Sequence, residues 1–222
     1  MGKRFVITDI HGCYQTLRHL LEVILRPASN DHVYLLGDYI NKGPLSKETV
    51  EYLMKLGKQP NFHLLRGNHE QVLLDVIDQK TSVFDLYEKG GIHTMQSFRI
   101  QHPTELSEKY TNFFRQLPYY FELEDFWLVH AGFNFDISDP LTDLNAMLTI
   151  RQMSYNESFL KKKRIIHGHI PLKLKTVIKN INNTNWNLHL DSGCVYPHRP
   201  GMGFLSVLEL NSMHFTCKEC ID

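Results

Sequence analysis

The chain has 222 residues, of which 42% are hydrophobic and 22% are charged. This length and composition allow one substantial hydrophobic core, so we expect a single domain over residues 1–222. The 24 basic and 24 acidic side chains cancel. A neutral chain has no general attraction for nucleic acid or for an acidic membrane surface, so any anion must be bound by local groups.

The N-terminal residues lead directly into a strand-like run, without the apolar segment of a secretory signal. No apolar run approaches the roughly 18 residues that a membrane span needs. We therefore expect a cytoplasmic protein with no membrane or nucleic-acid partner. The sequence makes no prediction of its oligomeric state.

The first half of the chain predicts alternating strands and helices. Strand-like runs begin at residues 3, 31 and 61, and amphipathic helical patterns follow them at residues 14–25, 45–57 and 70–78. In the second of these helices we expect Ser46 as the N-cap and Gly57 as the stop. The segment from about residue 80 to 115 predicts a turn and helices that cover a site.

Short strands dominate the second half, with one helix near residues 144–153. The predicted strands occupy residues 119–123, 126–132, 164–170, 175–181, 186–193 and 203–210, and residues 214–219 are a candidate for the last one. Strands in both halves predict an α/β (α+β) fold of four layers, αββα, in which two mixed sheets pack face to face between helices.

Polar clusters follow several of these strands: TDIHG, GDYINKG, RGNHE, VHAG and HGHI. The carboxyl ends of strands in an open α/β sheet lie along one crevice, so these clusters are expected to converge. They supply carboxylate, amide and imidazole groups without thiolate, a set that suits manganese, iron or zinc. The set is too large for one ion. It fits two ions that share a carboxylate, an arrangement that promotes in-line displacement at phosphorus.

The four cysteines are Cys13, Cys194, Cys217 and Cys220. The pair in CKEC has the spacing of metal ligands, but a tetrahedral zinc site needs a second pair or two histidines. Because Cys13 belongs to a different motif, we expect an exposed thiol pair rather than a zinc site.

The motifs DIHG, GDYINKGP, LLRGNHE, VHAG and IIHGHIP resemble, in order, the signatures of the calcineurin-like metallophosphoesterases, in their phosphoprotein phosphatase branch. The chain is most similar to the small bacterial and lambda-phage-type serine/threonine protein phosphatases. The similarity is shared with the symmetrical dinucleoside tetraphosphatases. It runs from residue 5 to about residue 210.

The resemblance implies a β-sandwich that carries two divalent ions, with manganese preferred and iron or zinc as alternatives. Asp9 and His11 would hold the first ion, and Asp38 would bridge both. The remaining ligands, on the second ion, would be Asn68, His130 and His169. His167 is expected to be a strand residue or a partner of a ligand.

The resemblance also implies in-line attack on phosphorus by a hydroxide that bridges the two ions, with no phosphoenzyme. His69 would donate a proton to the leaving oxygen. Three side chains would bind the phosphate: Lys42, Asn68 and Arg151. The alternative for Arg151 is a solvated helix residue.

Two positions depart from the family pattern Gly-Asp-x-x-Asp-Arg-Gly. Asn41 stands where the second acid is expected; it can accept a hydrogen bond from His69 through its amide oxygen but supplies no charge, so proton donation should weaken. Lys42 replaces the arginine and loses the bidentate fork. These changes predict a preference for leaving groups that need little protonation, such as aryl phosphates, phosphotyrosine or phosphoanhydrides.

Three functions are consistent with these features. The first is a metal-dependent serine/threonine or dual-specificity protein phosphatase that acts on a phosphorylated protein or a small phosphoester. The second is a symmetrical dinucleoside tetraphosphate hydrolase. The third is a non-catalytic phosphate-sensing or partner-binding module, which only Asn41 and Lys42 support and which the complete ligand set opposes.

Overall fold

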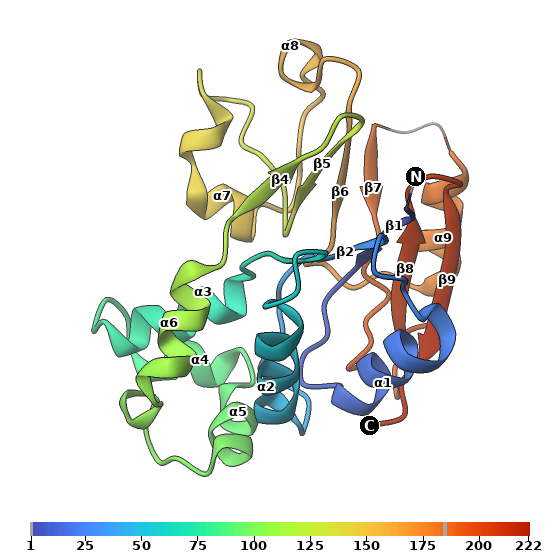
Figure 1. Cartoon of the computed structure of the whole chain (residues 1–222). Helices are drawn as coiled ribbons and strands as arrows, with labels where there is room; N and C mark the ends of the chain where they lie inside the picture. The colour runs from blue at the N-terminus through green and yellow to red at the C-terminus, as the bar shows by residue number, and fades with distance from the viewer. Residues whose placement is uncertain (1, 184–185) are drawn as a thin grey trace.

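A computed structural model of the chain describes residues 2–183 and 186–222. Two mixed β-sheets lie against each other, and helices flank them (Figure 1). The predicted four-layer αββα arrangement of two mixed sheets is confirmed. Within the described residues, no helix combines the length and apolar character that crossing a membrane requires.

The first sheet has the strand order β3-β2-β1-β8-β9. Its strands are β1 (Arg4–Ile7), β2 (His32–Leu35), β3 (Phe62–Leu64), β8 (Phe204–Glu209) and β9 (His214–Glu219). β1, β2 and β3 run parallel to one another, while β8 is antiparallel to both β1 and β9. The carboxyl ends of the three parallel strands therefore lie at one edge.

The second sheet has the order β4-β5-β6-β7. Its strands are β4 (Tyr120–Glu122), β5 (Phe126–Val129), β6 (Arg164–His167) and β7 (Asn187–His189). β5, β6 and β7 are parallel, and β4 pairs antiparallel with β5. Motifs that follow β5 and β6 thus share an edge in the same way as those of the first sheet.

The helices connect and cover these strands. They are α1 (Tyr14–His19), which continues as the π-helix η1 (Leu20–Leu25), α2 (Ser46–Leu56), α3 (Asn68–Ile77), α4 (Val83–Glu88), α5 (Gly91–Phe98), α6 (Glu108–Gln116), α7 (Leu144–Thr149), α8 (Glu157–Leu160) and α9 (Leu174–Asn182). Two short 3-10 helices are η2 (Pro103–Glu105) and η3 (Pro140–Thr142).

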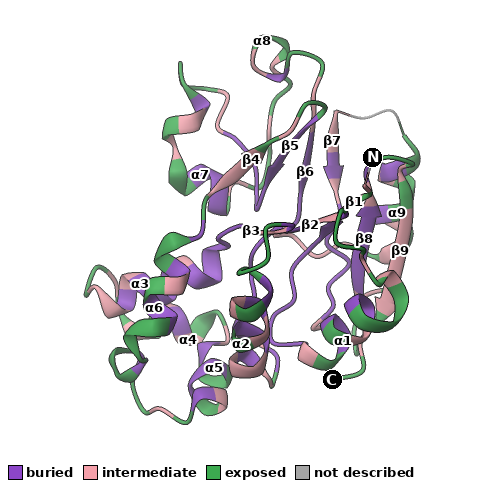
Figure 2. Ribbon diagram, viewed as in Figure 1, coloured by how far each residue is buried: buried purple, intermediate pink, exposed green. Residues whose placement is uncertain are grey.

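Alternation along the strands separates the core into layers, because successive side chains of a strand point to opposite faces. In β1, Phe5 and Ile7 pack with residues of α1, α2 and α3, whereas Val6 packs between the two sheets. In β5, Leu128 faces the other sheet, and Trp127 packs with α7 and α8. Figure 2 shows β5, β6 and β8 largely buried, β4 and β9 mostly of intermediate exposure, and the outer surfaces of the helices exposed.

Two local predictions are wrong. Residues 175–181 form most of the helix α9 instead of a strand, because Val177 and Ile181 lie four residues apart and both are buried, while Ile178 is exposed. The β-branched residues of this segment favoured a strand only locally. The N-cap of α2 is Leu45 and not Ser46; the Ser46 hydroxyl accepts the N–H of Asn41 instead.

Candidate metal and phosphate site

Asp38 lies at the centre of the site, in the loop that follows β2. Its side chain is buried, and its two carboxylate oxygens face different neighbours. Oδ2 lies 3.5 Å from His11 Nε2 and 3.7 Å from His69 Nε2, whereas Oδ1 lies 3.5 Å from His130 Nε2. One carboxylate therefore faces two groups of nitrogen atoms, as a bridging ligand must.

The group around Oδ1 collects side chains that follow β3, β5 and β6. Asn68 Oδ1 lies 3.0 Å from His130 Nε2 and 2.9 Å from His169 Nδ1, and these two nitrogens are 3.2 Å apart. Ligand atoms bound at about 2.1 Å to one ion are roughly 3.0–3.4 Å from one another. The predicted ligands of the second ion thus have the spacing that a common ion requires, although ligation itself remains a prediction.

The imidazole rings of His11 and His130 are oriented for ligation. Nδ1 of His11 lies 3.0 Å from the carbonyl oxygen of Ile40, and Nδ1 of His130 lies 2.9 Å from that of Leu36. A carbonyl oxygen only accepts, so Nδ1 carries the proton and donates it. Each Nε2 then presents a lone pair toward Asp38, the state in which a histidine binds a metal.

Three buried acids lie close to this centre. Burial raises the pKa of Asp9 well above its ordinary value, and the charges of Asp191 and Asp38 raise it further. Burial likewise raises the pKa of Asp38. A cation bound beside such buried carboxylates stabilises their charged form. The donor set and the charge distribution both fit two divalent ions, which when bound would neutralise phosphate charge and lower the pKa of a bound water.

Asp9 itself lies at the margin of the site. Its carboxylate oxygens accept the backbone N–H of His169 at 3.0 and 3.2 Å. A Cβ atom at Gly168 would lie 2.1 Å from Asp9 Oδ1, which explains the glycine between the two histidines of HGH. Among the described residues, two groups of possible ligands share Asp38, and Asp9 belongs to neither. Its role as a ligand of the first ion stays a prediction.

The backbone of the site is strained. His11, Asp38, Asn41, Lys42 and His169 all have positive φ, between 49° and 74°. The left-handed region costs a non-glycine residue about 1 kcal/mol or more. These sharp turns bring the side chains of several loops together, and contacts elsewhere in the fold must offset their strain.

Glu70 supplies some of these contacts, and sequence reasoning missed it. The buried carboxylate accepts backbone N–H groups of Asp38 and Gly67, both at 2.9 Å, through Oε2. Oε1 accepts those of Tyr39 at 2.8 Å and Ile40 at 3.3 Å. Glu70 thus holds the loop that carries Asp38 against the start of α3. A glutamate at the third helical position after Gly67 is the sequence signal from which this role could have been predicted.

Asn41 contacts His69, but in the orientation opposite to the one expected. Its Nδ2 lies 2.8 Å from His69 Nδ1, and its Oδ1 accepts the Thr94 hydroxyl at 2.7 Å. The amide therefore donates to His69 rather than accepting from it. A ring whose Nδ1 accepts an N–H is a neutral imidazole, so Asn41 opposes the protonated form of His69 more strongly than the sequence suggested.

Lys42 places its ammonium group beside the first-ion ligands. Nζ lies 2.9 Å from His11 Nε2, and the backbone N–H donates to the carbonyl of Gly90 at 3.1 Å. This second contact brings the turn between α4 and α5 to the site. The turn adds Lys89, a cation that the sequence analysis did not predict.

A pocket of about 240 Å³ opens over these ligands. Three cationic side chains line it: Lys42, Lys89 and Arg151. Asn68, His69, His169 and Tyr196 contribute to the same pocket. The structure therefore brings Arg151 to the predicted phosphate site, although Arg151 follows α7 and does not belong to that helix.

His167 is separate from the ligand groups. Its ring packs against that of His189 at a centroid distance of 4.5 Å, and its Nδ1 lies 3.2 Å from the carbonyl oxygen of Gly168. Burial lowers the pKa of His167 to about 4. Both rings lie beside the site rather than in it.

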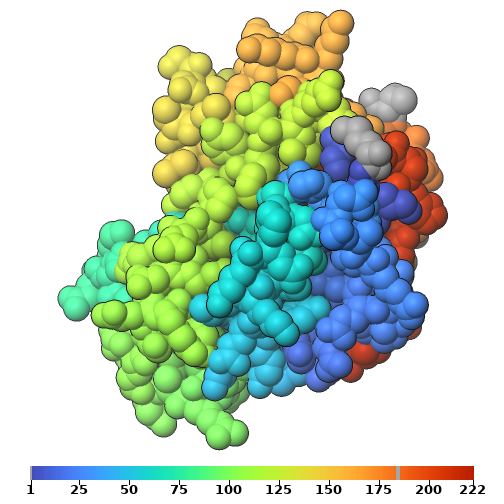
Figure 3. Space-filling view, viewed as in Figure 1, coloured from blue at the N-terminus to red at the C-terminus, as the bar shows by residue number. Residues whose placement is uncertain are grey.

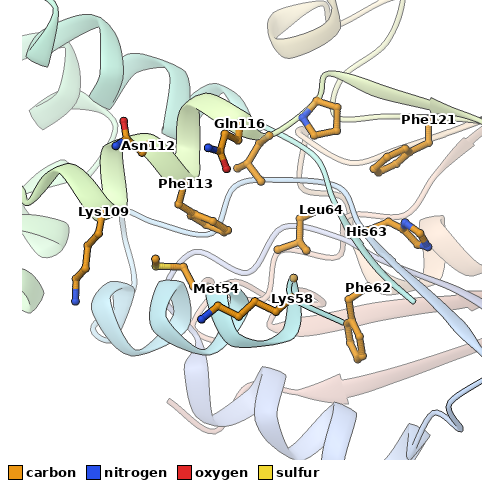
Figure 4. A pocket seen from close by; sticks show the side chains of 13 residues that line it. Met54, Lys58, Phe62, His63, Leu64, Lys109, Asn112, Phe113, Gln116 and Phe121 are labelled. Atoms are coloured by element: carbon orange, nitrogen blue, oxygen red, sulfur yellow. The ribbon is translucent and has the colours of Figure 1, made fainter. Parts of the chain in front are cut away.

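A larger cavity lies elsewhere. It measures about 560 Å³ and lies between α2 and α6, above the edge strand β3. Figure 4 shows Phe62, Leu64, Phe113 and Phe121 beside it, with Lys58 and Lys109 at its margin. It contains none of the ligand groups around Asp38, so the chemistry belongs to the smaller pocket.

Comparison with known proteins identifies the family. A family model described as calcineurin-like phosphoesterase matches residues 3–199. The chain belongs to this family. Membership of this family implies hydrolysis of the metallophosphoesterase type and divalent metals.

The curated relatives of this calcineurin-like phosphoesterase include bacterial proteins named symmetrical bis(5'-nucleosyl)-tetraphosphatase. The Vibrio campbellii protein is 30% identical over 141 residues, which cover 64% of this chain and 47% of the relative. The Coxiella burnetii protein is 29% identical over 175 residues, which cover 77% of this chain and 55% of the relative. The chain thus spans about half the length of these relatives.

Solved structures share its fold. A proposed diadenosine tetraphosphatase matches with a TM-score of 0.70 at 19% identity, over 100% of this chain and 95% of the other. A protein serine/threonine phosphatase from Saccharomyces cerevisiae matches with a TM-score of 0.66 at 16% identity, over 100% and 81%. At such identities the similarity concerns the fold alone.

Proposed function

We propose that this metallophosphoesterase hydrolyses a phosphoanhydride bond in a polyphosphate of the dinucleoside polyphosphate class. The observation that carries the proposal is the set of cations in one pocket. Lys42, Lys89 and Arg151 line the space next to His69 and His169. A polyphosphate carries charge on several consecutive phosphates, so a pocket lined by three cations suits it better than it suits a single phosphate group.

The leaving group supports the same substrate class. Hydrolysis adds water to phosphorus and breaks the bond to the bridging oxygen, which must leave as an anion or take a proton. The contact of the Asn41 amide N–H with His69 Nδ1 disfavours the protonated imidazole. A serine alkoxide needs a proton from such an acid, whereas a phosphate leaves as a stable anion. The site is therefore better suited to phosphoanhydrides than to alkyl phosphoesters.

The names of the bacterial relatives agree with this substrate class. They support it without deciding it, because this chain covers only about half of each of those proteins. Manganese as the ion, a single domain over residues 1–222 and a cytoplasmic location are further parts of the proposal.

The serine/threonine or dual-specificity protein phosphatase, which the sequence favoured, becomes the second candidate. One observation favours it: Glu88, Lys89 and Arg151 are exposed at the rim of the pocket. An exposed rim leaves the site accessible to a phosphate on a protein surface.

A substrate panel tests the proposal. Protein treated with a chelator and reloaded with Mn²⁺ is assayed with diadenosine tetraphosphate, p-nitrophenyl phosphate and a phosphoserine peptide. We expect the highest kcat/KM for the dinucleoside substrate. A phosphopeptide hydrolysed with higher kcat/KM would replace the proposal by the protein phosphatase. Two metals per chain with no turnover of any substrate would favour the non-catalytic module.

Two variants separate the parts of the argument. Lys89→Ala should lower kcat/KM for diadenosine tetraphosphate about tenfold, the loss of one charged hydrogen bond, and leave p-nitrophenyl phosphate nearly unchanged. Lys179→Ala, an exposed lysine on α9, is the control and should change neither.

Asn41→Asp should raise kcat/KM for the phosphoserine peptide more than for p-nitrophenyl phosphate; an equal increase would refute the leaving-group argument.

A further inference from the structure

Three of the four cysteines lie together, although they come from three distant segments. Cys13 precedes α1, Cys194 follows β7, and Cys220 follows β9. Their Sγ atoms all lie within 4.8 Å of one another, and those of Cys13 and Cys220 are 3.9 Å apart. The expectation of an exposed CKEC thiol pair is therefore wrong. Cys220 turns inward to this cluster, and Cys217 does not belong to it.

The C-terminal residues hold Cys220 in place through contacts that do not involve sulfur. The backbone N–H of Cys220 donates to the carbonyl of Gly203 at 2.8 Å, and that of Ile221 donates to the Thr16 hydroxyl oxygen at 2.9 Å. The Asp222 carboxylate accepts the Thr16 hydroxyl at 2.7 Å. Figure 3 shows the red C-terminal segment against the blue N-terminal one. The thiol of Cys220 is thus brought to Cys13 by the fold itself.

The distances fit a shared metal ion better than a disulfide. Thiolates bound to zinc at about 2.3 Å in a tetrahedral site are about 3.8 Å apart, close to the separation of Cys13 and Cys220. A disulfide needs a separation of about 2.05 Å, so the two sulfurs would have to approach by nearly 2 Å. It would also leave the third thiol of the cluster unpaired.

The surroundings suit a thiolate site. Cys13 and Cys194 are buried, and Cys220 is partly exposed, which leaves a path for an ion. Soft thiolate ligands select zinc over the oxygen-preferring ions that suit the carboxylate centre. The Asp222 carboxylate accepts from Thr16 and from the N–H of Gln15, and it does not belong to the cysteine group.

We propose that Cys13, Cys194 and Cys220 bind one zinc ion through their three sulfur atoms, at a site separate from the Asp38 centre. Binding would release the thiol protons to solvent and leave the fourth zinc position for water. The ion would tie the C-terminal residues to the loop that also carries His11. Because this site uses sulfur alone, it does not depend on the function proposed above.

Cobalt substitution tests the site, because thiolate-to-cobalt charge-transfer bands cannot arise from the carboxylate, amide and imidazole ligands around Asp38. Protein is prepared under reducing conditions, stripped with a chelator and titrated with Co²⁺, and zinc content is measured separately after Zn²⁺ loading and dialysis. We expect charge-transfer bands in the wild type. Cys220→Ser should lose them together with one equivalent of zinc. Cys217→Ser, in the same CKEC motif, is the matched control and should retain both.

Alkylation gives a second readout that needs no variant. Zinc should protect Cys220, the partly exposed thiol of the cluster, from iodoacetamide, while Cys217 reacts as fast as in the metal-free protein. Absence of charge-transfer bands in the wild type would overturn the proposal. So would their loss in Cys217→Ser, or a Cys13–Cys220 disulfide found by mass spectrometry in the reduced, zinc-loaded protein.

Discussion

Replacement of Glu70 by glutamine tests how the loop of Asp38 is held. The wild-type carboxylate accepts four backbone N–H groups, two on each oxygen. In Glu70→Gln one oxygen becomes an NH₂ group, which cannot accept, so two buried N–H groups lose their partner. Each costs about 1–3 kcal/mol, which gives a gross loss of about 2–6 kcal/mol.

Part of this loss is offset. Burial and the charge of Asp38 raise the pKa of Glu70 to about 7. The ionised carboxylate therefore has an unfavourable free energy of its own at neutral pH, which the amide lacks. The raised pKa corresponds to an offset of about 3 kcal/mol, so we expect a net loss of about 1 kcal/mol in the free energy of unfolding. Because Asp38 loses its backbone anchor, the affinity for Mn²⁺ should also fall about tenfold.

Urea unfolding followed by circular dichroism measures the first effect on metal-free protein, and calorimetric titration with Mn²⁺ measures the second. Glu219→Gln, at the exposed end of β9, removes the same charge without a loop contact and serves as the control. If Glu70→Gln unfolds within about 0.5 kcal/mol of the control and binds Mn²⁺ equally well, the carboxylate does not hold the loop and the reasoning is refuted.

Three further predictions concern the same centre. Asp38→Ala should abolish hydrolysis of every substrate and lower the bound Mn²⁺ measured by metal analysis; activity that persists would overturn the assignment of the bridge. Mn²⁺ affinity should fall as pH drops below about 6, because burial raises the pKa of Asp38 to about 6 and the carboxylate takes up a proton. The pKa of His130 is lowered to about 4 by burial, so this ring stays neutral over the same range. Constant affinity down to about pH 4 in calorimetry would contradict this. The stability of the metal-free protein depends on pH in the opposite direction. Because the folded state binds the Asp38 proton more tightly than the unfolded state, the contribution of Asp38 to folding stability falls as pH rises from about 4 to 6. Lys42→Arg should lower KM for phosphate substrates by restoring a bidentate donor, and an unchanged KM in steady-state kinetics would show that Lys42 does not contact phosphate.

Short-range patterns were sufficient for most strands and for the order of the site motifs. The runs that became β1, β2, β5 and β6 are short and apolar, and each leads into a polar turn. Because the carboxyl ends of neighbouring parallel strands meet, convergence of the motifs that follow them could be expected before the structure was known. Asp38 and Asn68, after β2 and β3, come together in this way, as do His130 and His169, after β5 and β6. The meeting of the two pairs depends on how the two sheets pack.

The local sequence pattern gave a wrong prediction where the same pattern is compatible with both a strand and a helix. Residues 174–182 contain β-branched residues that suit a strand and a four-residue spacing that suits a helix, and packing of Val177 and Ile181 into the core decided for the helix. The Ser46 cap failed for a similar reason, since Asn41 engages its hydroxyl from the neighbouring loop.

The family and the residue types of the candidate ligands could be read from the chain, because both depend on residue identity and on short spacings. The orientation of side chains in the site depends on contacts between distant segments. The Asn41 amide takes its orientation from Thr94, 53 positions along the chain, and the Cys13 and Cys220 sulfurs meet across 207 positions. Contacts at such separations follow from the order of strands in a sheet and from the packing of loops on it, and no local pattern in the chain encodes them.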